Sequence, residues 1–223
     1  MIDLSVVVPI LDDDLQLKEL LPELSGAFSE VMIIDGGDSE LAQQLAEHHG
    51  AVYSRCCPSR GRQIAKGVEF SSKEVIWVLH VDAYNLDHPI SRLKEICESR
   101  LAVWGRFDVE MPRLRCVPRL MNMRSRLTKI CTGDQGMFFS RKIIEEIGGL
   151  PSQSLMEDVE ASRCLKKMFP DAFVACREKL GASDRRWLSN GLVRTIFLMW
   201  WYRILYFFGV SPSTLYRKYY GRK

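Results

Sequence analysis

The first part of the chain alternates short apolar runs with longer amphipathic stretches. Buried strands are predicted by the apolar runs at residues 4–10, 30–37, 51–54 and 75–82. Helices are predicted between them, from apolar positions at helical spacing, at residues 15–28, 39–50 and 60–71. Apolar strands that alternate with amphipathic helices are typical of an α/β fold. We therefore expect a Rossmann-like, mostly parallel sheet with helices on both faces.

The second half of the chain is less regular. Alternating apolar and polar positions at residues 101–111 predict a half-buried strand. A basic helix is expected at residues 117–130, and a loop that enters a strand at residues 133–140. Residues 156–169 predict a helix with acids in its first turn, where the helix dipole favours them. A short strand is expected at residues 171–176.

Acidic side chains stand at the carboxyl ends of two predicted strands. Asp35 ends one of them. His80 and Asp82 end another at alternate positions, so that both point to the same side of an extended chain. Ligands of open parallel sheets bind beyond the carboxyl ends of the strands. The sequence therefore predicts a ligand cleft that receives these side chains.

Three carboxylates are candidates for chemistry in this cleft. Asp82 suits a hard cation, because Mg²⁺ and Mn²⁺ take one or two carboxylates together with the phosphate oxygens of a substrate. Glu157 and Asp158 are adjacent at a predicted helix start. Adjacent side chains point in different directions on a helix, so one carboxylate can face the cleft as a general base. The alternative, that all three are ordinary turn or first-turn acids, stays open at this point.

Two further segments suit a nucleotide. Asp35 is followed by Gly36, which lets a ligand approach the backbone closely, and its carboxylate can accept a hydrogen bond from a base or a ribose hydroxyl. Arg60, Gly61 and Arg62 lie at a predicted helix start, where an anionic phosphate would be held. Glycine-containing turns are common, so each segment alone is also compatible with a plain loop.

Composition and charge narrow the choice of partners. The 223 residues, 47% hydrophobic and 26% charged, fit either one large globular domain or one domain with an appendage. The net charge of +3 is small, but residues 112–131 carry six Lys or Arg and residues 185–223 carry eight, both without an acid. Such segments favour anionic partners, such as nucleotide diphosphates or a lipid surface. Nucleic acid is not expected, because the acids at the predicted cleft would repel its backbone.

The C-terminal segment is aromatic and apolar. Residues 192–212 contain Arg194 and Arg203, with only eight residues between them. A spanning helix needs about 20 mostly apolar residues, so we expect no membrane crossing. An amphipathic helix at the membrane surface fits better, and it would bring an acceptor in or near lipid within reach. A helix that packs against its own domain or against the partner in a homodimer is the alternative.

The cysteines and the N-terminus predict a cytoplasmic protein. The seven cysteines are odd in number and include no C-x-x-C pair, and the first residues lack the pattern of a signal peptide. Free thiols in a reducing compartment are therefore expected. The adjacent Cys56 and Cys57 are interpreted as part of a loop, with a site for a soft metal or arsenic(III) as the alternative.

The order of short motifs points to a family. These motifs are S-V-V-V-P-I, I-I-D-G-G-D-S-E, S-R-G-R-Q-I-A-K-G, V-L-H-V-D-A, G-D-Q-G-M-F-F-S, M-E-D-V-E-A-S-R-C-L and S-D-R-R-W. In this order they resemble the family 2 glycosyltransferases, which have the GT-A fold. More narrowly, the chain is similar to a small bacterial subgroup associated with radical-SAM, selenium and arsenosugar genes. The resemblance implies a GT-A domain at residues 1–187 and a basic, aromatic helical segment at residues 188–223.

The resemblance also implies residue roles. Asp158 would be the catalytic base, with Glu157 beside it. Asp82 would bind the divalent cation, Mn²⁺ or Mg²⁺, that holds the donor diphosphate. The nucleotide-binding residues would be Pro9, Asp35, Gly36, Arg60, Gly61, Arg62 and Val81. The acceptor side would be lined by Asp134, Gln135, Arg186 and Trp187.

Two positions depart from the family pattern. His80 stands where the D-x-D motif has its first acid, so it would ligate the metal weakly or donate to phosphate. Ser183 stands where the Q-x-x-R-W motif has its glutamine, which disfavours processive polymerisation.

The predicted activity is that of an inverting, metal-dependent hexosyltransferase. It would move a sugar from a nucleotide-diphosphate donor, with UDP as the expected carrier, to an acceptor hydroxyl. A lipid-linked acceptor and an arsenosugar precursor both stay open, and the expected place is the cytoplasm or the inner face of the cell membrane.

Two other functions compete. A sugar-1-phosphate nucleotidyltransferase would want a glycine-rich loop with an arginine after the first strand, where the acidic P-I-L-D-D-D stands. A non-catalytic protein that binds membrane surfaces is disfavoured by the acids at three separate strand or helix ends.

Overall fold

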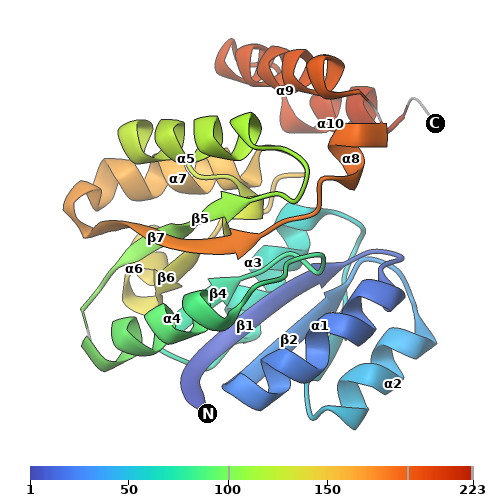
Figure 1. Cartoon of the computed structure of the whole chain (residues 1–223), viewed down its shortest axis with the longest axis vertical. Helices are drawn as coiled ribbons and strands as arrows, with labels where there is room; N and C mark the ends of the chain where they lie inside the picture. The colour runs from blue at the N-terminus through green and yellow to red at the C-terminus, as the bar shows by residue number, and fades with distance from the viewer. Residues whose placement is uncertain (100, 190, 222–223) are drawn as a thin grey trace.

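Seven strands form one twisted sheet in the computed structural model, which describes residues 1–99, 101–189 and 191–221, apart from the side chains of Arg186 and Tyr220. The strand order is β3-β2-β1-β4-β6-β5-β7 (Figure 1). The strands are β1 Ile2–Ile10, β2 Phe28–Asp35, β3 Val52–Arg55, β4 Val75–Val78, β5 Trp104–Glu110, β6 Phe138–Ser140 and β7 Phe173–Gly181. The short β6 runs antiparallel to both β4 and β5, and the other pairs are parallel. The prediction of a mostly parallel α/β sheet is confirmed.

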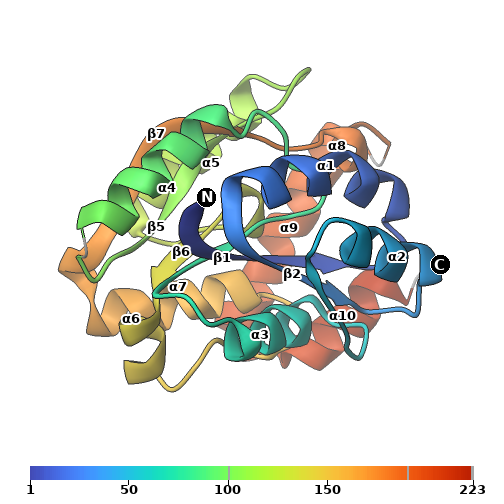
Figure 2. The same ribbon diagram turned by 90° about the horizontal axis from the view of Figure 1, so that it is seen from below.

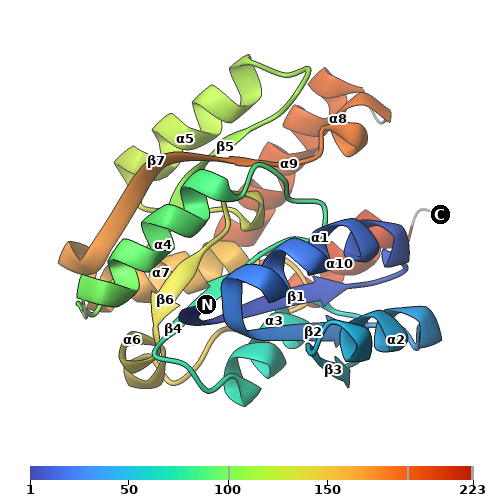
Figure 3. The ribbon, with the colours of Figure 1, turned by 60° about the horizontal axis from the view of Figure 1, so that its bottom comes forward.

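Helices cover both faces of this sheet, as Figures 2 and 3 show. The helices on one face are α1 Asp14–Ala27, α2 Glu40–His48 and α4 Asp87–Ser99. The helices on the other face are α3 Arg60–Phe70, α6 Arg141–Glu146 and α7 Glu157–Met168. The alternation within β1 explains this sandwich. Val6 and Val8 belong to the first apolar cluster while Val7 belongs to the second, so the strand is buried on both sides.

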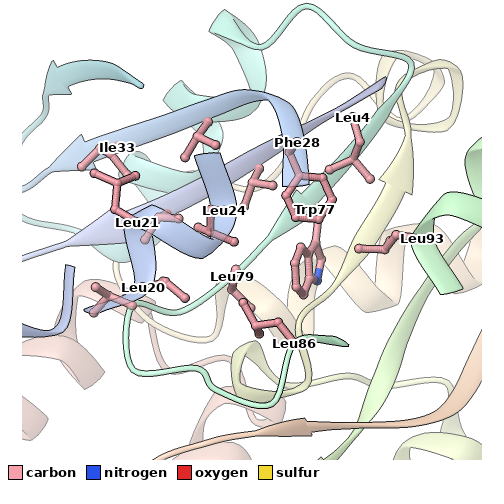
Figure 4. Close-up of a cluster of buried hydrophobic side chains, with 14 of the residues drawn as sticks. Leu4, Leu20, Leu21, Leu24, Phe28, Ile33, Trp77, Leu79, Leu86 and Leu93 are labelled. Atoms are coloured by element: carbon pink, nitrogen blue, oxygen red, sulfur yellow. The ribbon is translucent and has the colours of Figure 1, made fainter. Parts of the chain in front are cut away.

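Trp77 on β4 lies at the centre of the first cluster (Figure 4). Its ring packs at 5.7 Å from that of Phe28 and at 5.9 Å from that of Phe107. The indole N–H donates to the carbonyl of Gly136 at 3.2 Å, which satisfies its only polar group. The cluster thereby connects the first strands to the antiparallel β6 region.

β4 is shorter than the sequence predicts. The strand ends at Val78 instead of continuing to residue 82, because the chain turns there and the N–H of Ala83 donates to the carbonyl of His80 at 3.1 Å. His80 and Asp82 therefore lie in a turn at the carboxyl end of the sheet instead of on an extended strand.

β5 also differs from its prediction as a half-buried strand. Arg106, at a position expected to face solvent, is fully buried, because helix α5 (Cys116–Thr128) covers that side. Its guanidinium donates to the carbonyls of Asn122 and Cys176 and pairs with Asp108. Arg106 occupies a polar position of the alternating pattern, and this pattern wrongly predicts that it faces solvent.

The C-terminal helices lie over the carboxyl end of the sheet, at the top of Figure 1. They are α8 Arg185–Ser189, α9 Leu192–Phe207 and α10 Pro212–Tyr220. A third apolar cluster, which includes Val117, Trp187 and Ile196, joins α5, α8 and α9. In the described part of the chain, no helix combines the length and apolar character needed to cross a membrane.

Candidate active site

Two adjoining cavities lie at the carboxyl ends of the strands. The first, here called the polar cavity, has a volume of about 400 Å³ and lies beside the end of β1, the turn after β4 and the start of α3. The second, here called the apolar cavity, has a volume of about 490 Å³ and lies between α5, the start of α7 and the C-terminal helices. The described residues that border both cavities are Arg60, His80, Asp134, Leu155, Glu157, Trp187 and Met199.

Of the carboxylates that line the polar cavity, two border this cavity alone. Asp82 comes from the turn after β4, and Asp13 comes from the segment between β1 and α1. Burial raises the pKa of Asp13, and the negative charge of Asp82 adds to the shift. The N–H of Leu11 donates to Asp13 Oδ2 at 3.1 Å and orients this carboxylate.

The chemistry of this pair fits Mg²⁺ or Mn²⁺. These hard cations take oxygen ligands, and with a nucleotide they commonly use one or two carboxylates plus phosphate oxygens. Among the described residues no three His, Cys, Asp or Glu side chains form a cluster that could hold a metal by themselves. Asp82 and Asp13 would therefore hold the cation jointly with a diphosphate.

His80 is turned towards the short 3₁₀ helix η1 (Gly133–Gln135). Its Nδ1 lies 3.1 Å from Asp134 Oδ1. Its Nε2 is buried without a hydrogen-bond partner among the described residues, and it packs so closely on Gly133 that a Cβ there would come within 2.4 Å. His80 thus holds Asp134 at the boundary of the two cavities, and its role as a metal ligand stays a prediction.

Glu157 and Asp158 begin α7 and divide their orientations. Asp158 borders the apolar cavity, and its oxygens accept hydrogen bonds from the N–H groups of Gly133 at 3.0 Å and Val159 at 2.7 Å. Glu157 borders both cavities. Burial raises the pKa of Glu157 to about 7, and the charge of Asp158 adds to this effect. Burial also raises the pKa of Asp158, although its two N–H donors oppose the shift.

The start of α3 brings a cation to these carboxylates. Arg60 borders both cavities, and its positive charge lowers the pKa of Glu157 and Asp158, against the effect of burial. Gly61 packs against the start of α7, where a Cβ would lie 2.1 Å from the carbonyl oxygen of Gln153 and 3.1 Å from the Cβ of Glu157. Arg62 is exposed and borders neither cavity.

Asp35 does not reach either cavity. Its buried carboxylate accepts hydrogen bonds from the N–H groups of Gly37 and Ser39 and from the hydroxyl of Tyr53. Gly36 packs against Gln63, whose side chain donates to the carbonyls at the ends of β1 and β2. Of the expected nucleotide-binding residues, Pro9, Arg60 and Val81 line the polar cavity, while Asp35 and Gly36 border neither cavity.

The expected acceptor residues also separate. Asp134 and Trp187 border both cavities. Gln135 is fully buried and instead braces the η1 turn, where its side chain bonds to Thr132 and Ser125. Asp184, three residues before Trp187 in the chain, forms an ion pair with Arg113 at 2.7 Å. The side chain of Arg186 lies outside the described residues.

Several residues of the site escape the sequence interpretation. They are Asp13 and Gln63 in the polar cavity, Arg124 in the apolar cavity, and Met199, which borders both. The run Asp12–Asp14 carries a signal for Asp13, since one acid of three beyond a strand end can face a cleft. Met199 carries none, because its position depends on how α9 folds back over the sheet.

Solved structures of other proteins share this fold at low sequence identity. No family model and no curated protein matches the sequence. Among solved structures, S. aureus TarS 1–349 superposes with a TM-score of 0.65 at 12% identity, over 82% of this chain and 61% of that one. Glucosyl-3-phosphoglycerate synthase (GpgS) from Mycobacterium tuberculosis, in complex with phosphoglyceric acid, gives 0.58 at 15% identity, over 79% and 70%. Both are GT-A glycosyltransferase structures.

The protein has a GT-A fold. A third comparison concerns the GT-A protein GpgS with Mn²⁺ and UDP-glucose bound, which superposes with a TM-score of 0.57 at 15% identity over 79% of this chain and 69% of that one. The GT-A sheet thus carries a nucleotide-sugar and a divalent cation in a protein of the same fold.

Proposed function

We propose that the protein is an inverting, metal-dependent glycosyltransferase that moves a sugar from a nucleotide-diphosphate donor, with UDP as the expected carrier, to an acceptor hydroxyl. One observation carries the proposal. Asp82 and the pair Glu157–Asp158, far apart in the sequence, border two adjoining cavities at the carboxyl end of a GT-A sheet. This arrangement supports the assignment of a cation to Asp82 and of a base to the pair Glu157–Asp158.

The polar cavity is the proposed donor site. Asp82 and Asp13 would hold a divalent cation, and Arg60 and Arg185 on the same walls would face the diphosphate. The cation, when bound, supplies charge stabilisation to the leaving diphosphate. The two arginines add to the same effect, because positive charge placed where negative charge develops lowers the barrier. The GpgS complex with Mn²⁺ and UDP-glucose supports this assignment by likeness of fold.

Asp158 is the proposed general base. The acceptor oxygen attacks the anomeric carbon from the face opposite the diphosphate, and the bond from that carbon to the diphosphate oxygen breaks. The bonding electron pair leaves with the diphosphate, and the hydroxyl proton passes to Asp158. The hydrogen bonds from Gly133 and Val159 fix the carboxylate for this step.

A thermal-shift screen of nucleotide sugars with Mn²⁺ tests the proposal, because a ligand that binds only the folded state raises its melting temperature. We expect UDP-sugars to raise Tm only with the cation, and Asp82→Ala to remove the cation-dependent part. Asp171→Ala, which changes an exposed acid outside both cavities, is the matched control. Equal shifts in the two variants, or no shift with any nucleotide sugar, would contradict the proposal.

A further inference from the structure

The apolar cavity has the lining of a hydrocarbon-binding site. Side chains of α5 and α9 form most of its apolar lining, and the carboxylates of Glu157 and Asp158 lie among its polar lining. Arg124 also borders it, and the Nε atom of this guanidinium is buried without a hydrogen-bond partner among the described residues. The apolar lining residues are Val117, Leu120, Met121, Met123, Leu127, Leu155, Met156, Trp187, Ile196, Met199 and Trp200.

The cavity opens to the surface through apolar side chains. Leu120, Met123 and Leu127 follow one another at positions i, i+3 and i+7 of α5, so they lie on one helix face, and all three are exposed. Leu127 is the most exposed of them, at 76%. Trp200 on α9 is exposed and also lines the cavity. An apolar molecule could therefore enter without crossing a polar rim at these residues.

Exposed apolar side chains continue from this opening as a stripe along α9. Its members recur at helical spacing, so they share one face of the helix. Large exposed apolar patches on a folded protein mark surfaces that bind a partner or a membrane. The exposed residues of the stripe, which ends at the C-cap Phe208, are Val193, Phe197, Trp200, Trp201, Ile204, Phe207 and Phe208.

The charge around these two helix faces selects the partner. Residues 112–131, which include α5, carry six Lys or Arg, and residues 185–223, which include α9 and α10, carry eight, with no acid in either. Arg115, Arg119, Arg194 and Arg217 are exposed. Apolar and aromatic side chains flanked by Lys and Arg are the combination that binds an anionic lipid surface.

We propose that α5 and α9 together form a face that docks on an anionic membrane, and that the apolar cavity takes the hydrocarbon chain of a single-chain amphiphilic alcohol from it. The hydroxyl of this acceptor then lies at Asp158, and Arg124 faces its polar head group. The inference rests on the proposed glycosyl transfer, for which it names the acceptor class. The reaction itself is unchanged: the acceptor oxygen replaces the diphosphate oxygen on the anomeric carbon.

The packing of α9 explains why its stripe is available. The opposite side of the helix is occupied, since Thr195 and Tyr202 are buried and Tyr206 donates to Glu160 on α7 at 2.5 Å. These contacts hold the helix on its own domain and leave the stripe facing outward. The tail therefore combines the two interpretations of its sequence, a helix packed on its domain and a surface for lipid.

The first experiment measures occupation of the cavity without any donor. The probe is n-decyl glucoside below its micelle-forming concentration, with glucose as the chainless control, and the readout is tryptophan emission, since Trp187 and Trp200 line the cavity. We expect saturable binding of decyl glucoside and none of glucose. Leu127→Glu, which puts a carboxylate at the opening, should weaken binding about tenfold or more.

The control variant is Leu41→Glu. Leu41 is an exposed leucine on α2, which lies at the other end of the molecule in Figure 1. It should bind decyl glucoside like the wild type. Equal affinity in Leu127→Glu and Leu41→Glu, or no binding to the wild type, would overturn the cavity assignment. UDP binding with Mn²⁺ is measured on the same samples. A wild type that binds decyl glucoside but not UDP would overturn the proposed transfer and leave the amphiphile site standing.

The second experiment measures the surface. Flotation with phosphatidylcholine vesicles, with and without phosphatidylglycerol, should recover the full chain only with the anionic lipid. Phe207→Ser/Phe208→Ser, which changes two exposed residues outside both cavities, should lose flotation and keep decyl glucoside binding. Flotation unchanged in this variant would overturn the lipid-docking face. A second outcome would also overturn the lipid-docking face. Sedimentation would show that the wild type forms a homodimer without lipid, that this dimer does not float, and that only this variant abolishes it.

Discussion

At the scale of single residues, the two adjacent carboxylates of the candidate site differ in their hydrogen bonds and in the cavities that they border. Asp158 is held by two backbone N–H groups and borders the apolar cavity, whereas Glu157 faces the boundary between the cavities. A base must hold its lone pair in a fixed place at the moment of attack. The hydrogen bonds therefore favour Asp158 over Glu157 for that role.

We expect Asp158→Asn to lower kcat by about 10²–10⁴-fold, the usual contribution of general-base catalysis, while the Kd for UDP with Mn²⁺ stays nearly unchanged. The amide keeps the shape of the carboxylate but cannot take the proton. Glu157→Gln is the matched comparison and should lose less. Turnover of Asp158→Asn that equals the wild type would remove this residue from the base role.

The pH dependence of the reaction should report the same carboxyl pair. Burial raises the pKa of both groups, that of Glu157 to about 7, and the active base is the deprotonated form. The acidic limb of kcat/KM should therefore lie well above the ordinary carboxyl value of about 4. Glu157→Gln removes one negative charge and should move this limb to lower pH. A limb that stays near the ordinary carboxyl value in the wild type would contradict the raised pKa values.

Residue patterns predict part of this site and miss the rest for a physical reason. Asp82 follows a strand, and Glu157 and Asp158 begin a helix. Such positions lie at the carboxyl edge of the sheet even where the exact ends of the elements differ from the prediction. Asp35 also ends a strand, but local N–H groups and Tyr53 bind its carboxylate inside the protein. Sequence position alone does not say which way such a carboxylate turns.

At the scale of elements, close packing of α3 holds the site together. Gly61 lies on the first turn of α3, where a Cβ would meet the carbonyl of Gln153 at 2.1 Å and the side chain of Glu157 at 3.1 Å. Its position at a helix start suggests phosphate binding, but the structure gives it a packing contact. A helix that can approach the start of α7 this closely places Arg60 beside the two carboxylates.

Gly61→Ala tests this packing. The added methyl group has backbone in its way, so we expect the free energy of unfolding to fall by about 1–3 kcal/mol and activity to fall with it. Gly26→Ala on α1 is the control, since nothing lies within 4 Å of the added Cβ and the residue is helical. There the change should be neutral or stabilising by about 0.4–1 kcal/mol. Urea unfolding of both variants measures the difference, and equal stabilities would refute the close contact.

The elements that the sequence predicts best are those with continuous patterns. β1, β2 and the helix α1 between them follow from apolar runs and helical spacing, because both faces of a parallel strand are buried. The ends of elements are less predictable. β4 stops at Val78 although apolar residues continue, since a hydrogen-bonded turn follows it. Arg106 on β5 is buried, although a charged residue in an alternating pattern is predicted to face solvent.

At the scale of the whole molecule, the tail completes the site. Thr195, Met199 and Tyr216 of α9 and α10 line the polar cavity, although the sheet begins more than a hundred residues earlier along the chain. The helices at the top of Figure 1 therefore lie over the strand ends and form part of the cavity wall. In the proposed reaction, such cover would favour transfer to an acceptor over hydrolysis of the donor.

Met199 is the place to test how the two cavities work together, because it borders both of them. We expect Met199→Trp to fill the junction, so that UDP binding with Mn²⁺ persists while transfer to the acceptor falls more than donor hydrolysis does. Phe197→Trp, at an exposed position of the same helix that borders neither cavity, should keep the wild-type ratio. Product analysis with a labelled UDP-sugar measures both reactions. If Met199→Trp keeps the wild-type ratio of transfer to hydrolysis at an unchanged melting temperature, the acceptor does not pass this junction and must reach the sugar by another route.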